Sequence, residues 1–349
     1  MTESFSISPA APTASPAQPR RVWRSIIREK RFRLGADAVL SLFTRGSALM
    51  IIAMLVGLIW VLTAAAIPSI RAFGWSFITT SDWRPNELQI PKKGPDGKVL
   101  LEDGEVVMET LPPRFGALPV IYGTVVSSTL ALIVAVPLSL GAALFLVRVA
   151  PKLKIVAPVS FLIEFLAAIP SIAYGIWGLF VLVPFLQGRE MTLHQILASV
   201  PGFHWLFFSS VHFGSGIVER VIPMTGRDML AGGLILAIMI LPIITAVSRD
   251  VLQAVPRAQI EGTLALGATW WQSSREMLRY SRSGLFGAIM LGLARAAGET
   301  MAITMVIGNS NQIAASPFAP AQTMSSLLAN EFAEASSPLH RSALIEVAL

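Results

Sequence analysis

Five long apolar runs alternate with polar segments along the chain. They lie near residues 47–70, 119–147, 155–185, 230–247 and 284–308. A helix needs about 20 apolar residues (range roughly 17–25) to cross ~30 Å of bilayer hydrocarbon, and each run is long enough. The pattern predicts an all-α membrane protein in which each run forms one span. Pro137, Pro170 and Pro242 fall inside runs, where each marks an expected kink.

The last residues of the chain, 342–349, read SALIEVAL and begin another apolar run. Eight residues cannot cross a bilayer. We therefore expect five complete spans followed by a truncated sixth. On this hypothesis, the intact gene continues for about 20 further apolar residues.

The composition agrees with a membrane location. Charged residues make up 14% of the chain and apolar residues 54%, whereas an ordinary soluble domain carries about 25% charged residues. The net charge of +6 is dispersed over the loops, so it does not indicate a nucleic-acid-binding patch. The chain has no cysteine, which excludes disulfides, thiol catalysis and cysteine-based zinc sites.

The distribution of basic residues predicts the orientation of the spans. The N-terminal tail and segments 148–154 and 249–283 together hold 16 lysines and arginines, and segments 71–116 and 187–228 hold nine. Cytoplasmic loops of membrane proteins are enriched in these residues. We therefore expect the first group, and the N-terminus with it, on the cytoplasmic side.

Three regions follow from this pattern. They are an Ala/Pro/Ser-rich tail expected to be disordered (1–19), a basic segment beside the cytoplasmic headgroups (20–45), and a transmembrane domain (46–349). The transmembrane domain carries an extracytoplasmic insert near 86–110. Within the insert, Asp103-Gly104 between two β-prone stretches predicts a tight hairpin turn.

Three histidines, His194, His204 and His212, share one outer loop. Their spacings of ten and eight residues match no common zinc pattern. We expect packing or interfacial roles for them, and no metal site.

Two charged residues, Arg295 and Glu299, fall inside the last apolar run. A lone charge at the middle of a bilayer costs about 3 kcal/mol, and such residues usually mark a substrate pathway. Because they are four residues apart, they are expected to share a helix face and to pair. A structural clip between helices is the alternative. Glu164 is a third charge at membrane depth and a candidate partner for the pair.

Small residues recur every fourth position on the same run, beside the charged face. A stripe of this kind allows another helix to approach closely. The charged pair is therefore expected to point into a helix interface or a cavity rather than into lipid. The stripe consists of Gly284, Ala288, Gly292 and Ala296.

The last cytoplasmic segment predicts two short helices with Gly267 between them. Pro256 can start the first helix, and Glu261 in its first turns suits the positive end of the helix dipole. The second is amphipathic and begins near Trp270 and Trp271, which indicate a docking surface or an interface anchor. The chain contains no G-x-x-x-x-G-K-[ST] loop, so it does not bind ATP by that route. Nothing in the sequence indicates an enzyme.

This segment resembles the Glu-Ala-Ala loop of ABC importer permeases. The pattern has a glycine six residues after the glutamate, and Glu261 and Gly267 keep that spacing. Gly262 and Thr263 replace the two alanines, and Arg279 stands at a position where the pattern has proline.

Four further segments resemble the permease subunits of bacterial phosphate ABC importers. The likeness covers roughly residues 45–349 apart from the insert, and six core spans are expected in that family, the last beginning where this chain stops. The segments are ALPVIYGTVVSS, LAAIPSIAYGIWGLF, GLARAAGETMAITMVIGNSNQI and SSLLANEFAEASSPLH.

The resemblance implies ATP-driven alternating access in the bacterial inner membrane. A periplasmic binding protein would deliver phosphate to this chain and a second, PstA-like permease subunit, and two ATPase subunits would dock on the cytoplasmic loop. It implies no cofactor and no metal. The coupling residues would be Glu261, Ala265 and Gly267, and the substrate pathway would contain Arg295, Glu299, Glu164 and Thr300.

Two alternatives to phosphate import stay open from residue types alone. One is a permease for another oxyanion, such as sulfate or molybdate. The other is an ATP-independent channel or a membrane scaffold, against which the ATPase-docking loop argues.

Overall fold

The computed structural model describes residues 19–91, 101–102, 105–106, 108–149, 156–197, 200, 202–213 and 216–349. Residues 1–18 of the predicted disordered tail therefore lie outside the described residues. The described chain forms two compact units, residues up to Val61 and residues Leu62–Leu349, each of which is described by itself.

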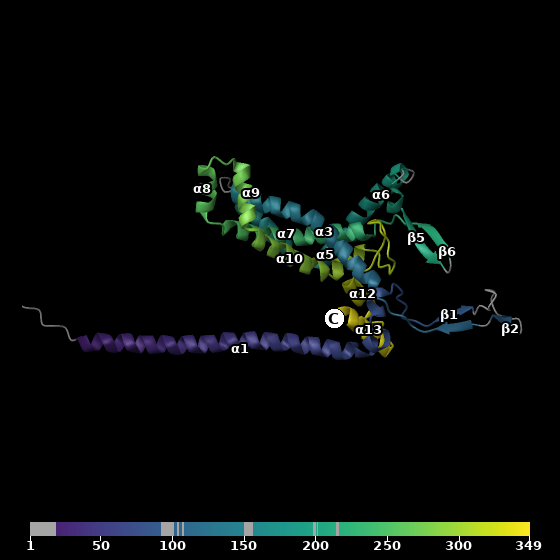
Figure 1. The fold of residues 1–349 in the computed structure, drawn as a ribbon, viewed down its shortest axis with the longest axis horizontal. Coiled ribbons are helices and arrows are strands. Elements are labelled where there is room, and N and C mark those ends of the chain that lie inside the picture. Colours follow the sequence, from purple (N-terminus) through teal and green to yellow (C-terminus); the bar gives the residue numbers. More distant parts are fainter. Residues whose placement is uncertain are drawn as a thin grey trace, which may run out of the picture. The chain divides into compact units, whose positions relative to one another are not determined.

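Helices make up most of the described chain (Figure 1). They are α1 (Pro19–Phe73), α2 (Ser76–Thr79), α3 (Leu118–Leu144), α4 (Val156–Ala168), α5 (Ser171–Trp177), α6 (Val183–Leu197), α7 (Met229–Gln253), α8 (Arg257–Ala265), α9 (Trp270–Tyr280), α10 (Arg282–Ala297), α11 (Met301–Val306), α12 (Met324–Glu331) and α13 (Pro338–Ala348). Two π-helical turns, η1 (Phe145–Val149) and η3 (Gly178–Leu182), extend α3 and join α5 to α6. A 3₁₀ turn, η4, covers His204–Leu206.

The described residues also form three small two-stranded antiparallel sheets. The first pairs β1 (Leu88–Pro91) with β4 (Met108–Leu111), the second β2 (Leu101–Glu102) with β3 (Glu105–Val106), and the third β5 (Phe208–Phe213) with β6 (Gly216–Val221). The register of β2 and β3 confirms the predicted hairpin, although its turn residues lie outside the described chain. The sequence analysis did not anticipate the β5–β6 hairpin.

Four helical segments of the described chain are long and apolar enough to span a membrane. They are Asp37–Phe73, Leu118–Val149, Ser171–Leu197 and Met229–Gln253. They confirm an all-α membrane protein and correspond to four of the five predicted runs. The exact number of spans stays a prediction.

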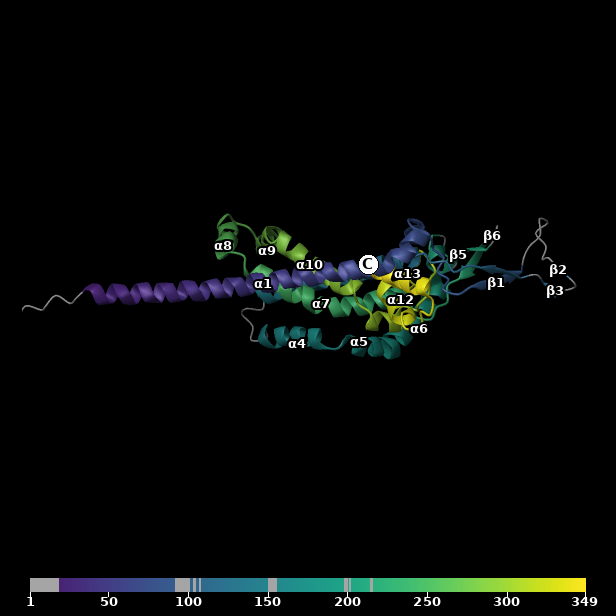
Figure 2. The same cartoon turned by 90° about the horizontal axis from the view of Figure 1, so that it is seen from below.

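The third predicted run, near 155–185, is not one helix. The chain breaks after α4, and Pro170 takes the extended N-cap conformation that starts α5 (φ −58°, ψ 138°). Figure 2 shows α4 and α5 as successive helices. Proline lacks the N–H that a helix interior needs, and it disfavours helical backbone at the residue before it. The kink predicted at Pro170 is therefore a complete break, whereas Pro137 and Pro242 lie inside α3 and α7.

The fifth predicted run, near 284–308, is also divided. Helix α10 ends at Ala297, Gly298 is its C-cap residue, and α11 starts only at Met301. With 16 residues, α10 is shorter than the segments that qualify as spans. The expectation of one unbroken helix through Arg295 and Glu299 is therefore wrong.

The main core of the second unit lies where α3, α7 and α10 run side by side (Figure 1). The predicted small-residue stripe of α10 faces α7: Ala288 and Ala296 are buried. A Cβ atom on Gly292 would lie 2.6 Å from Ile244 Cδ1, so only glycine permits this approach. The stripe therefore serves the close helix packing that its spacing predicts.

A second core joins segments far apart in the sequence. Ser342 of α13 accepts a hydrogen bond from Ser69 N (3.0 Å) and donates one to Ala65 O (2.9 Å). Glu331 of α12 accepts from Trp83 Nε1 at 2.8 Å and contacts His340 Nε2 at 3.0 Å. These bonds hold α12 and α13 against the end of α1 and the residues that follow it.

Candidate functional site

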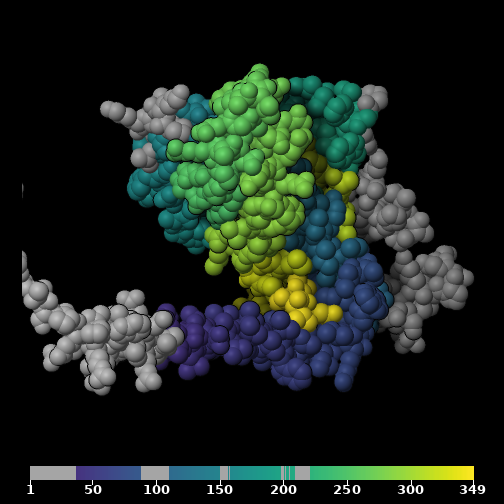
Figure 3. Space-filling model, turned by 60° about the vertical axis from the view of Figure 1, so that its left-hand side comes forward, coloured from purple at the N-terminus to yellow at the C-terminus, as the bar shows by residue number. Residues whose placement is uncertain are grey.

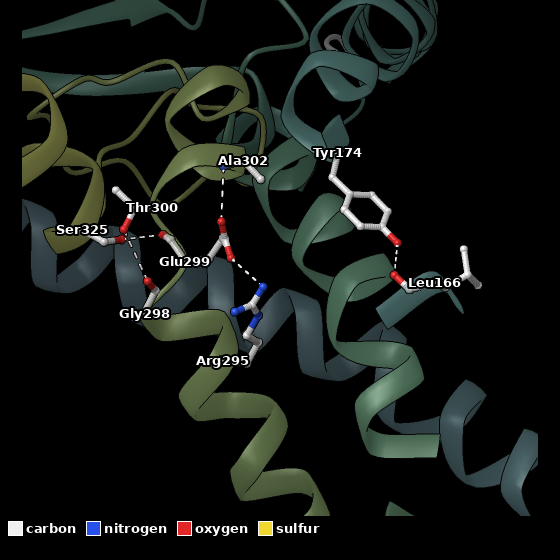
Figure 4. A network of polar contacts seen from close by, with 8 residues as sticks. All are labelled: Leu166, Tyr174, Arg295, Gly298, Glu299, Thr300, Ala302 and Ser325. Carbon is white, nitrogen blue, oxygen red and sulfur yellow. Dashed lines mark hydrogen bonds and ion pairs between the residues drawn. The ribbon is translucent and has the colours of Figure 1, made fainter. Parts of the chain in front are cut away.

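The break between α10 and α11 brings Arg295 and Glu299 together (Figure 4). Their side chains form an ion pair, with Arg295 Nη2 3.6 Å from Glu299 Oε2. The Glu299 side chain is 6% exposed and that of Arg295 is 49% exposed. The predicted pairing is confirmed, but its geometry differs from two residues on one continuous helix. Arg295 lies in the last turn of α10, and Glu299 follows the helix end.

Further hydrogen bonds hold both the side chain and the backbone of Glu299. Its Oε1 accepts a hydrogen bond from the backbone N–H of Ala302 (3.4 Å), and its backbone carbonyl accepts one from Ser325 Oγ (2.6 Å). Thr300 beside it donates to Gly298 O at 3.4 Å. The carboxylate therefore has a fixed position, while the guanidinium extends from it into more open space.

Glu164 does not join this pair. Its carboxylate lies 3.7 Å from Arg249 Nη2, and its side chain is 62% exposed. Arg249 also contacts Asp250. The suggested partnership of Glu164 with Arg295 and Glu299 is therefore replaced by an ion pair between α4 and the end of α7.

The predicted coupling residues lie on a helix–turn–helix at the surface of the second unit. Figure 3 shows α8 and α9, in green, on an outward face. Glu261 and Ala265 lie on α8, and both are exposed. Pro256 is the N-cap residue of α8, so Glu261 falls in the second turn, within the first turns where the sequence placed it. A cavity of about 360 Å³ lies between α8 and α9.

Gly267 ends α8 in the way that its position suggested. Its φ is +81°, in the left-handed region that favours glycine. Gly267 N donates to Leu264 O and Ala268 N donates to Thr263 O, a Schellman motif that satisfies the last carbonyls of the helix. Thr269 then starts α9 with a capping box formed with Gln272. The turn between the helices is thus well defined.

His194, one of the three outer histidines, packs against an aromatic side chain. Its ring packs edge-on against Phe207, with centroids 5.2 Å apart. This is the packing role expected for it. No cluster of three or more metal-binding side chains occurs within the part of the chain that the structure describes.

The sequence did not predict the pair of buried carboxyl groups formed by Glu190 and Asp228. Glu190 of α6 is 3% exposed and Asp228, the N-cap residue of α7, is 1% exposed. The two carboxyl groups are close enough to interact electrostatically. Glu190 accepts from Gly226 N (3.2 Å) and Asp228 from Ala231 N (2.8 Å). Burial raises the pKa of Asp228, so a shared proton suits the pair. Thirty-eight residues separate them, and no motif links them.

Comparison with known proteins identifies the scaffold. Residues 135–329 match the family of binding-protein-dependent transport system inner membrane components. A phosphate transport system permease protein PstC from Mesorhizobium japonicum is 38% identical over 92% of this chain and 86% of its own length. Proteins of the same name from Haemophilus influenzae and Pasteurella multocida are 41% and 40% identical, over 86% and 88% of this chain and 84% of their own lengths.

The chain belongs to this family of transport permeases. It is therefore a multi-pass membrane protein and a transport component. The matched residues include the break that holds Arg295 and Glu299, the exposed α8–α9 segment, and the buried carboxyl pair. The features described above thus lie within the shared permease scaffold rather than in an added region.

Proposed function

We propose that this chain is a permease subunit that carries inorganic phosphate in an ATP-driven import complex. The observation that carries the proposal is 38–41% identity, over most of the chain, to proteins named as phosphate transport permeases. Sulfate or molybdate import is less favoured, because those relatives are named for phosphate. A channel or scaffold has no use for an exposed segment of the α8–α9 kind.

Arg295 is the residue that we propose contacts phosphate. Its guanidinium is always charged and offers several donors in a planar fork that suits an oxyanion. Half of its side chain is exposed, so the guanidinium can contact a ligand while it stays paired with the buried Glu299. Glu299 would orient it and keep the unloaded site near neutral, which favours release after capture. Thr300 adds a hydroxyl beside the pair. For Glu164, a pathway role is supported only by its predicted depth in the membrane.

The α8–α9 segment is the surface that we propose docks on an ATPase subunit. Glu261 and Ala265 share one exposed face of α8, and Leu264 and Leu266 are 45% and 90% exposed. Exposed apolar residues on a polar helix indicate an interaction surface. The rigid turn at Gly267 would fix the angle at which the partner meets α8 and α9.

The complete assembly would contain a second, PstA-like permease, two ATPase subunits and a periplasmic phosphate-binding protein. This follows from the family rather than from contacts in the structure. The same reasoning places the chain in the bacterial inner membrane, with residues 20–45 and the N-terminus on the cytoplasmic side. ATP would be hydrolysed by the separate subunits.

Uptake of radiolabelled phosphate by vesicles that contain the full complex tests the proposal. Arg295→Gln should lower uptake at least about tenfold, and Arg295→Lys should retain part of it, because lysine keeps the charge but loses the fork. Arg84→Gln is the matched control, since Arg84 also pairs with a nearby carboxylate (Asp82, 2.6 Å). Excess sulfate or molybdate should leave uptake unchanged.

The structural-clip alternative requires a different variant. Exchanging the two charges does not isolate it, because Glu299 also accepts from Ala302 N–H and arginine has no acceptor. Glu299→Gln keeps that acceptor and removes only the charge. Normal uptake by both Arg295→Gln and Glu299→Gln, at normal expression, would refute the pathway role. If sulfate or molybdate competed with phosphate for uptake, the proposed substrate would have to be another oxyanion.

A further inference from the structure

Arg148 connects the end of α3 to α9. It lies in the π-helical turn η1 that extends α3. Its Nη2 donates to Ser273 Oγ (3.2 Å) and its Nε to Ser274 Oγ (3.4 Å). Its guanidinium carbon also lies 5.7 Å from the ring centroid of Trp270, a distance at which a cation attracts an aromatic face. One side chain from a long apolar helix thus makes three contacts with the first turns of α9.

The same contacts reach α8 through a hydroxyl. Thr263 Oγ1 of α8 lies 3.0 Å from Ser273 Oγ. Ser273 is buried, and the Thr263 and Arg148 side chains are half-buried, so water competes only in part for these bonds. Arginine and both hydroxyls therefore form one continuous polar connection from α3 through α9 to α8. We call Arg148, Ser273 and Thr263 the clasp.

The clasp supplies a connection that the chain itself does not. The α8–α9 segment continues directly from α7 at one end and into α10 at the other. Among the described residues, its contacts with α3 include the clasp, the contact of Arg148 with Trp270, and an apolar cluster that contains Ala143, Met277 and Val255. Apolar contacts tolerate sliding, because they have no preferred direction. Charge-assisted hydrogen bonds are directional, so the clasp fixes the position of α3 relative to the segment.

We propose that Arg148 is a positioning residue for transport, which makes α3 move together with the α8–α9 segment. The inference rests on the proposed function for what displaces the segment, namely an ATPase subunit. Without the clasp, a displaced segment would still pull α7 and α10 but would slide past the end of α3. ATP hydrolysis would then continue with less phosphate moved per ATP.

The test measures uptake and ATP hydrolysis in the same vesicles, with the complete complex. Thr263→Val keeps the shape and removes the hydroxyl, and Arg148→Gln removes the charge. Each should lower the phosphate moved per ATP hydrolysed, by a factor on the order of ten, and Thr263→Ser should restore it. The double variant should be no worse than the worse single variant, because both break one connection.

Thr129→Val is the matched control. Thr129 Oγ1 donates to Val125 O (2.7 Å) within α3, so its hydroxyl bonds its own helix and joins no second one. The control should keep the wild-type ratio. An unchanged ratio in both Thr263→Val and Arg148→Gln, or independent effects in the double variant, would overturn the inference. Absence of phosphate uptake by the wild-type complex would instead refute the proposed function.

For variants that transport too little phosphate to give a phosphate-to-ATP ratio, the distance between α3 and the α8–α9 segment can be measured instead. The chain has no cysteine, so Leu138→Cys on α3 and Leu266→Cys beside α8 give two unique spin-label sites. Both leucines are exposed, at 56% and 90%. The distance distribution should be narrow with the clasp intact and broader in Arg148→Gln. Equal widths would show that the clasp does not hold α3 to the segment.

Discussion

Gly123 allows α3 to approach the start of α12, and its replacement by alanine should destabilise the fold. A Cβ atom built on Gly123 would lie 2.1 Å from Gln322 O and 3.0 Å from Gln322 C. These are backbone atoms, which cannot turn aside as the end of a flexible side chain does. Gly123 is buried, and Thr124 beside it accepts a hydrogen bond from Met324 N (2.9 Å). The two segments must therefore separate by about an ångström, and this bond stretches with them.

The expected cost follows from overpacking. Forcing one extra carbon into a packed core costs typically about 1–3 kcal/mol, and sometimes more when backbone has to move. Weakening the bond from Met324 N adds about 1 kcal/mol. Against this, alanine in place of glycine gains roughly 0.5–1 kcal/mol inside a helix. We expect a net loss of about 2–3 kcal/mol.

Gly141→Ala supplies the control on the same helix. Gly141 is exposed, and a Cβ atom there would meet nothing within 4 Å. That variant should leave the stability unchanged or raise it by up to about 1 kcal/mol. The melting temperature of each variant can be measured on the detergent-solubilised complex, as the temperature at which half of the complex is no longer recovered by size-exclusion chromatography. Equal melting temperatures for Gly123→Ala and Gly141→Ala would refute the reasoning from packing.

Two further predictions concern the turn after α8 and the buried carboxyl pair. Gly267→Ala should strain the turn by about 1–2 kcal/mol, because the φ of Gly267 is +81°. The variant should therefore lower phosphate-stimulated ATP hydrolysis. Gly262→Ala is the control, because Gly262 has an ordinary helical φ and a Cβ atom there would meet nothing within 4 Å. Because burial raises the pKa of Asp228, the folded state holds that proton more tightly than the unfolded state. Stability should therefore be highest below the ordinary Asp pKa of about 4 and fall as pH rises through the raised pKa. Asp228→Asn, which can still accept from Ala231 N, should flatten this fall in a melting series from about pH 5 to about pH 8, and an unchanged slope would contradict it.

The long apolar helices could be predicted from the sequence because hydropathy depends on composition alone. The breaks could not, because in runs 155–185 and 284–308 apolar residues continue on both sides of each break. Pro170 indicated an irregularity, but a proline in an apolar run can mark either a kink or a complete break. At the other break, the signal was Glu299, whose carboxylate accepts from Ala302 N at the start of α11. A charge inside an apolar run was therefore evidence for a helix end as well as for a pathway.

The ion pair and the exposed α8–α9 helix–turn–helix were predictable because their residues are close in sequence. Arg295 and Glu299 are four residues apart, and Glu261 and Gly267 six. Arg148 and Ser273 of the clasp are 125 positions apart, and the two carboxyl groups belong to different helices, so only the packing of α3, α6, α7 and α9 brings these residues together. Arg148 illustrates the difference. In the sequence it contributed one basic charge to a cytoplasmic loop, whereas in the structure it connects two helices.

Helix α3 links the two regions that transport would have to coordinate. At one end, Arg148 holds the α8–α9 segment. Near the other end, Thr124 Oγ1 accepts from Met324 N, and Ser325 in the same turn of α12 donates to the backbone carbonyl of Glu299. A tilt of α3 would therefore displace α12 and, through Ser325, the residue that orients Arg295. On this view the surface proposed to dock on an ATPase subunit and the guanidinium proposed to bind phosphate would communicate through α3, which hydrogen bonds hold at both ends. Loosening either end should therefore lower the amount of phosphate moved per ATP hydrolysed, while ATP hydrolysis itself continues.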